Sequence, residues 1–172
     1  MLKMAGLLFL FLGCTGAGLA VSASLGERVR LLEEMKHMLK LLAGEIRHGH
    51  ASLPEAFFQT GKRCKPPFSG FLREAARMME ESSGMGLAEI VRTAGERELK
   101  ASALKPDDRE ILLELGERLG VLDVESQLGI LELSWEQAGR QADAAREAYR
   151  QKSRVARYLG VLSGLFLVVL LF

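Results

Sequence analysis

Residues 124–149 read VESQLGILELSWEQAGRQADAAREAY, and this stretch decides the fold class because one seam runs through it at helical spacing. The seam residues follow one another at alternating intervals of four and three positions: Val124, Leu128, Leu131, Trp135, Ala138, Ala142, Ala145 and Tyr149. A sustained seven-residue repeat predicts a long helix that packs along a second helix. The three alanines indicate that the two helices approach most closely in that part.

A second seam with intervals of three and four positions lies near the start of the chain: Leu32, Met35, Leu39, Leu42 and Ile46. It predicts a helix over 27–48 that pairs with the long helix at 123–157. If the two run antiparallel from a common end, residue 27+n lies opposite residue 157−n. Leu42 then faces Ala142 and Ile46 faces Ala138, so that large side chains meet small ones.

The segment between these two helices contains residues that typically end or start helices, and it shows no strand-like alternation of apolar and polar residues. Breaks near Gly49–Pro54, at Cys64–Pro67 and at Ser82–Gly86 divide the segment, and Pro106 starts another helix. We therefore expect short helices at 53–62, 67–82, 87–101 and 106–119. Ser52-Leu-Pro-Glu55 reads as a capping box, and Asp123 as the N-cap of the long helix. The fold class is all-α, a helical bundle built on a long antiparallel stem.

The core of the bundle should combine large residues of the long helix with those of the short helices. From the long helix we expect Leu128, Leu131 and Trp135. The short helices supply Phe57, Phe58, Phe68, Phe71, Leu72, Met79, Leu87, Ile90, Val91, Ile111, Leu115 and Leu119.

Both ends of the chain are apolar. Met4–Gly26 is uncharged, and so is Tyr158–Phe172. Uncharged apolar runs of about 18 residues or more are typical of membrane-spanning helices. We expect an N-terminal transmembrane helix at 1–26, a helical domain at 27–157 and a C-terminal transmembrane helix at 158–172. The last run is short, and Arg154 and Arg157 can reach the headgroups beside it.

The N-terminal run leaves an alternative open, and the C-terminal run contains a packing pattern. Met1-Leu2-Lys3 followed by Leu7–Leu12 also resembles the start of a signal peptide, which would be cleaved after Val21-Ser22-Ala23 or carry a lipid. We favour a retained helix, because the second apolar end gives it a partner span. In that second span, Gly160 and Gly164 form a GxxxG pattern that can pack two membrane helices together.

The charges set the orientation. Lys3 is the only charged residue outside Glu27–Arg157, and that segment holds 22 basic and 22 acidic residues. Cations close to the inner ends of both spans place the helical domain in the cytoplasm. A neutral domain gives no electrostatic argument for a nucleic-acid partner.

No pattern of an enzyme or of a cofactor site stands out. His48-Gly-His50 with Glu45 and Cys64 matches no standard zinc spacing, and no nucleophile elbow or phosphate loop is present. We expect no catalytic residue, metal, cofactor or small-molecule substrate, and free thiols at both cysteines. The chain reads as an anchored interaction module, whose partner-binding candidates are charged or polar: Glu45, Arg47, Glu55, Arg109, Glu117, Arg118 and Gln127.

Three segments together resemble a known family. Leu115-Gly-Glu-Arg-Leu-Gly-Val-Leu-Asp-Val-Glu-Ser-Gln127 is similar to the L-G-x-x-L-G-x-x-D-x-x-x-Q stretch of stage III sporulation protein AB. Glu45-Ile-Arg-His-Gly49 with Leu53-Pro-Glu-Ala56 resembles that family's E-I-x-x-G-x-x-x-L-x-E-A segment. The tail from Leu159 to Gly164 resembles its C-terminal end.

The resemblance implies a membrane protein of endospore-forming bacteria, made in the mother cell, within the channel complex that links mother cell and forespore. It also implies likeness to the cytoplasmic domain of the inner-membrane platform proteins of type II secretion and type IV pilus machines. Those platforms engage a hexameric ATPase, so a secretion-type ATPase and other channel subunits are the implied partners.

The residues by themselves fit two classes of function. One is a structural platform that self-associates into a homo-oligomer through its spans and docks a motor. The other is a membrane-anchored helical regulator that binds a signalling or proteolytic enzyme as a one-to-one complex. The corner at Leu115–Gln127 likewise has two readings, a structural turn and a docking surface.

Overall fold

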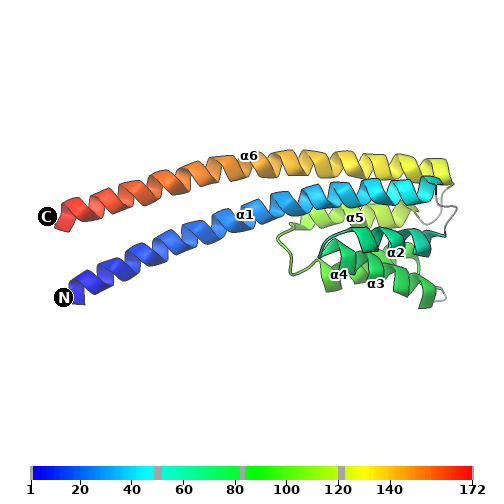
Figure 1. The fold of residues 1–172 in the computed structure, drawn as a ribbon, viewed down its shortest axis with the longest axis horizontal. Coiled ribbons are helices and arrows are strands. Elements are labelled where there is room, and N and C mark those ends of the chain that lie inside the picture. Colours follow the sequence, from blue (N-terminus) through cyan, green and yellow to red (C-terminus); the bar gives the residue numbers. More distant parts are fainter. Residues whose placement is uncertain (1, 49–51, 82–83, 120–122, 172) are drawn as a thin grey trace. The chain divides into compact units, whose positions relative to one another are not determined.

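The computed structural model of the chain is all-helical in the part that it describes (Figure 1). It describes the backbone at 2–48, 52–81, 84–119 and 123–171, and the side chains at 23–47, 52–81, 84–119 and 123–152. The helices are α1 (Leu2–His48), α2 (Leu53–Arg63), α3 (Phe68–Glu81), α4 (Leu87–Glu98), α5 (Pro106–Leu119) and α6 (Val124–Leu171). The all-α prediction is confirmed, and each short helix begins within one residue of its expected start.

The chain divides into two units. One consists of Met1–Val29 with Asp143–Phe172, and the other is Arg30–Ala142, which contains α2 to α5 with the adjoining parts of α1 and α6. Within the second unit, α2 packs on α3, α3 on α4 and α4 on α5. The short helices therefore pack on their neighbours in sequence.

The predicted membrane spans lie mainly where the structure does not describe side chains. Among the described residues, no helix is long and apolar enough to cross a membrane. The side chains of the expected spans at 1–26 and 158–172 are not described except at 23–26, and the same holds for Gly160, Gly164 and the alternative signal-peptide segment.

Helix α1 buries two adjacent rows of side chains. The predicted seam is confirmed at Leu32, Met35, Leu39 and Leu42, all almost fully buried, while Ile46 is half-buried. A second row is buried as well, at Leu31 and Met38. Two buried rows on one helix mean that protein covers it over a wide angle.

The seam of α6 is confirmed in its middle but departs from the prediction at Trp135 and at both ends, where Val124 is 53% exposed and Tyr149 is 39% exposed. The buried residues are Leu131, Ser134, Ala138, Ala142 and Ala145, so that Ser134 replaces Trp135. Trp135 is 41% exposed, and the Lys36 ammonium lies 5.3 Å from the centroid of its ring. Serine is small enough for close helix packing, whereas an indole can keep its N–H in water and stack with a cation at the surface.

The predicted register of the stem is wrong by nine residues. A Cβ at Gly139 would lie 3.9 Å from Lys36 Cε, whereas the sequence argument put residue 148 opposite Lys36. Within the other unit, a Cβ at Gly26 would lie 3.5 Å from the Tyr149 ring, again nine residues from the expected partner at 158. The two seams share the same spacing, so they match at several offsets and the sequence pattern alone does not select one.

In the observed register, we expect substitutions at Leu42 and at Ala142 to have additive effects on the free energy of unfolding. A nine-residue offset separates them by about 13 Å along the stem. Leu42→Ala should cost about 2–5 kcal/mol of unfolding free energy and Ala142→Leu about 1–3 kcal/mol. Because residues further apart than about 10 Å rarely couple, the double variant should lose the sum of both effects. Denaturant unfolding of the full chain in detergent, followed by Trp135 fluorescence, measures these unfolding free energies. If the double variant recovered stability, Leu42 and Ala142 would be in contact and the register predicted from the sequence would be correct.

The core of the short helices follows the prediction closely. The expected residues that are buried are Phe57, Phe68, Phe71, Leu72, Ile90, Val91, Ile111, Leu115 and Leu119. Phe58 is instead 41% exposed, and Met79, Leu87 and Leu128 are half-buried. The buried face of α2 consists of Ala56, Phe57, Thr60 and Gly61. Phe58 lies outside this face, because it is turned about 100° further around the helix than Phe57.

Hydrogen bonds at the helix starts confirm one predicted cap and correct another. Asp123 Oδ1 accepts the Ser126 backbone N–H at 2.9 Å and Oδ2 accepts its hydroxyl at 3.1 Å, which lowers the pKa of Asp123. Ser52 does occupy the N-cap of α2, but its side chain makes no capping hydrogen bond. At α5 the buried Asp108 accepts the Lys105 backbone N–H at 2.8 Å, the reaching-back half of a capping box.

Candidate docking surface

Two of the predicted partner-binding residues make contacts within the chain, one an ion pair and the other a hydrogen bond. Glu45 Oε1 on α1 pairs with Arg63 Nη1 at the end of α2, at 3.2 Å. Gln127 Nε2 on α6 donates to the backbone carbonyl of Leu119 at 3.0 Å, and so joins the start of α6 to the end of α5. Both side chains therefore hold elements of the fold together.

The other candidates are wholly or partly open to solvent. Arg47 is exposed near the end of α1, and Glu117 and Arg118 are exposed on the last turn of α5. A Cβ added at Gly116, just before them, would lie 2.8 Å from Val91 Cβ, so this glycine allows α4 and α5 to approach closely. The corner thus combines a structural turn with a charged surface. Gly120, which belongs to the same corner, lies outside the described residues.

Glu55 belongs to a surface strip on α2 that we call the α2 ridge: Glu55, Phe58 and Lys62. Intervals of three and four positions place these residues on one face of the helix. Glu55 accepts a hydrogen bond from Gln59, and Lys62 Nζ lies 4.2 Å from the centroid of the Phe58 ring. The ridge offers an aromatic ring between an acid and a base.

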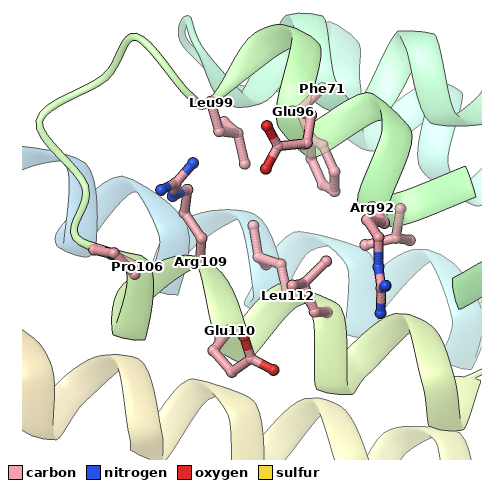
Figure 2. Close-up of a pocket in the computed structure, with 11 residues that line it drawn as sticks. Phe71, Arg92, Glu96, Leu99, Pro106, Arg109, Glu110 and Leu112 are labelled. Atoms are coloured by element: carbon pink, nitrogen blue, oxygen red, sulfur yellow. The ribbon is translucent and has the colours of Figure 1, made fainter. Parts of the chain in front are cut away.

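Arg109 lines a pocket of about 180 Å³ between α4 and α5, the α4–α5 pocket (Figure 2). Its floor is apolar and buried, and consists of Phe71, Val91, Leu99 and Leu112. Charged residues of both helices also line it: Arg92, Glu96, Arg109 and Glu110. Apart from Arg109, sequence reasoning did not single out these residues, because a pocket arises only once two helices are placed.

Two observations distinguish this pocket. Arg109 Nε is buried and has no hydrogen-bond acceptor among the described residues. Figure 2 shows the guanidinium reaching from α5 toward Leu99, at the end of α4. Gly95 also lines the pocket, and a Cβ there would meet no atom within 4 Å. The pocket therefore has open space and an arginine with unused hydrogen-bonding capacity.

Away from the pocket, a surface cluster links α3 to α4. Glu74 on α3 accepts two hydrogen bonds from Arg77, both at 2.9 Å, and one from Arg97 on α4. The Arg77 bonds, with further help from Arg97, lower the pKa of Glu74 to about 2 from its ordinary value of 4.5.

This shift predicts a pH-dependent contribution to stability. Because the folded state depresses the pKa of Glu74, its contribution is present above about pH 4.5 and disappears as the pH falls through about 2. As the pH falls through this range, the unfolding free energy of the wild-type chain should therefore decrease more steeply than that of Glu74→Gln. The two curves of unfolding free energy against pH should meet near pH 2. Chemical unfolding at a series of pH values measures both, and parallel curves would contradict the assignment.

Cys64 shows no sign of a reactive site. It is a free, buried thiol at the end of α2, and burial, with a smaller effect of Glu34, raises its pKa to about 11. A thiol that stays protonated at neutral pH is a poor nucleophile and a poor metal ligand. Among the described residues no three His, Cys, Asp or Glu side chains gather to hold a metal ion. His50, part of the weak zinc pattern, lies outside those residues.

Comparison with known proteins gives the same family at three levels. The family model of stage III sporulation protein AB matches residues 3–172. Stage III sporulation protein AB of Bacillus subtilis (strain 168) is 29% identical over 175 residues, which cover 99% of each chain. A solved structure of a stage III sporulation protein AB superposes with a TM-score of 0.65 at 24% identity, over 72% of this chain and 97% of that one. The last match supports the fold, and the first spans nearly the whole sequence, so the chain belongs to the stage III sporulation protein AB family.

Proposed function

We propose that this chain is a non-enzymatic platform of the channel complex between mother cell and forespore, required for endospore formation. The observation that carries the proposal is the family match over residues 3–172, which includes both apolar ends as well as the helical domain. The name of the family and of its Bacillus subtilis member places those proteins in sporulation.

In this proposal the apolar ends at 1–26 and 158–172 anchor the chain in the mother-cell membrane that faces the forespore. The distribution of cations then puts residues 27–157 on the cytoplasmic side. A cytoplasm-active reporter inserted beside Gly84, which has a φ of 116° in an exposed loop, should be active. Activity of a reporter that works only after export would overturn this orientation.

The cytoplasmic domain docks a secretion-type ATPase and other channel subunits. Charged side chains that are exposed on α5, Glu117 and Arg118, support such a surface, because they are available without unfolding any helix. Arg47 on α1 and Glu55 on α2 offer a second position for contact.

Retention of the ATPase by the full chain tests the proposal. Tagged full-length protein from membranes of sporulating cells should copurify with the ATPase. Glu117→Arg with Arg118→Glu should reduce this retention and sporulation, while the thermal unfolding temperature stays close to wild type. Glu132→Arg, an exposed change on α6, is the matched control and should change neither.

Two results would redirect the proposal. If the corner variants sporulate normally, the docking face lies elsewhere, first around Arg47 and Glu55. If the chain retains no ATPase but forms a one-to-one complex with a protease or signalling enzyme, the platform is replaced by the anchored regulator.

A further inference from the structure

We propose that a second copy of this chain docks into the α4–α5 pocket through its α2 ridge. The ring of Phe58 from one copy covers the apolar floor of the pocket in the next, and Glu55 pairs with Arg109. The inference deepens the proposed platform function, from which it takes only the expectation that copies self-associate.

The size and polarity of the two surfaces match. Phe58 is 41% exposed, a large apolar side chain that the fold leaves in water. The pocket of about 180 Å³ has a floor of buried aliphatic and aromatic side chains. A cavity of about 150 Å³ is already large enough for benzene, so a phenyl ring fits. Docking removes both apolar surfaces from water.

The charges of the two surfaces also complement each other. The ridge runs acid, ring, base over about 10 Å of helix. The pocket offers an arginine for the acid and a glutamate for the base, Arg109 and Glu110. Arg109 is the partner that we assign to Glu55, because it lines the pocket and its guanidinium reaches from α5 toward Leu99. A carboxylate close to this guanidinium strengthens the contact beyond apolar burial.

The proposed contact is head-to-tail. The ridge and the pocket are different surfaces, and each copy carries one of each, so docking leaves a free ridge at one end and a free pocket at the other. Such heterologous contacts close into rings or continue as rows. A two-fold symmetric dimer would instead bring ridge to ridge.

Cross-linking between two differently tagged full-length copies tests this geometry in membranes. In a background of Cys14→Ser and Cys64→Ala, one copy carries Gln59→Cys beside the ridge and the other carries Arg92→Cys at the pocket. A short bis-maleimide should join the two tags. Cross-links between two Gln59→Cys copies, in place of the mixed product, would overturn the proposal.

Two blocking variants act from opposite sides of the contact. Phe58→Ser removes the ring, and Gly95→Leu fills the pocket from a position where a Cβ meets no neighbour, so neither should disturb the fold. Each should lower the mixed cross-link about tenfold, as expected for loss of an aromatic anchor. An unchanged yield with both variants would overturn the proposal.

A charge exchange tests the specific pair. Glu55→Arg in the ridge copy and Arg109→Glu in the pocket copy should each reduce the cross-link, and the two together should restore it. Glu132→Arg serves again as the control and should have no effect. Absence of restoration, with both variants folded, would overturn the pairing.

The outcomes separate this inference from the proposed function. If Phe58→Ser abolishes ATPase retention while wild-type copies show no mixed cross-link, the ridge serves a different protein and self-docking is refuted. If the copies cross-link as expected but the chain retains no ATPase, self-docking is supported and the proposed function fails.

Discussion

Phe57→Ala is expected to lower the free energy of unfolding by about 3–5 kcal/mol, whereas Phe58→Ala, one residue further on, should cost less than about 1 kcal/mol. The two rings are chemically identical but differ in burial, since Phe57 is 2% exposed and Phe58 is 41% exposed. Removal of the first leaves a cavity between α2 and the core, and removal of the second mainly ends a surface contact with Lys62.

Denaturant unfolding of the full chain in detergent checks both variants, with Trp135 fluorescence as the signal. Phe58→Leu is a useful control, because it keeps apolar volume at the same exposed site and should stay close to wild type. Equal losses for Phe57→Ala and Phe58→Ala would show that α2 is covered on both faces, contrary to the structure.

Gly116→Ala and Gly95→Ala should change stability in opposite directions. Both glycines lie within helices, where alanine is favoured by up to about 1 kcal/mol. At Gly95 a Cβ meets no atom within 4 Å, so the substitution should stabilise the chain by roughly that amount. At Gly116 the new Cβ would lie 2.8 Å from Val91 Cβ, which cannot rotate away, so overpacking should cost about 1–3 kcal/mol.

Each of the two variants is a control for the other, because Gly95→Ala adds a methyl group to α4 and Gly116→Ala adds the same group to α5. Val91→Ala should rescue part of the loss in Gly116→Ala, since it removes the methyl groups that flank the new Cβ. Stabilisation by Gly116→Ala alone would mean that α4 and α5 are further apart than the structure places them.

The elements of the fold could be predicted from the sequence because each carries a local signal. Pro106 marks the start of α5, Asp123 caps α6, and the seam through Leu32 and Leu42 gives the buried face of α1. These signals depend on residues a few positions apart, so no tertiary information is needed.

The register and the surfaces could not be predicted in the same way. A repeated seven-residue spacing fits a partner at several offsets, so the contact between Lys36 and Gly139 needed the three-dimensional arrangement. The same holds for Ser134, whose polar side chain gave no reason to prefer it over Trp135 in the seam. The sequence did select Arg109 as a binding candidate, but the pocket around it depends on how α4 and α5 pack.

The two buried rows of α1 have a consequence for synthesis on the ribosome. Residues such as Met38 and Leu42 are translated first, whereas Leu131 of the α6 seam follows roughly 90 residues later, which takes about 5–20 s at cellular rates. The short helices pack on sequence neighbours and can fold during that interval. The part of α1 that packs on α6 stays uncovered until α6 emerges, and apolar surface exposed in this way makes a nascent chain prone to aggregation.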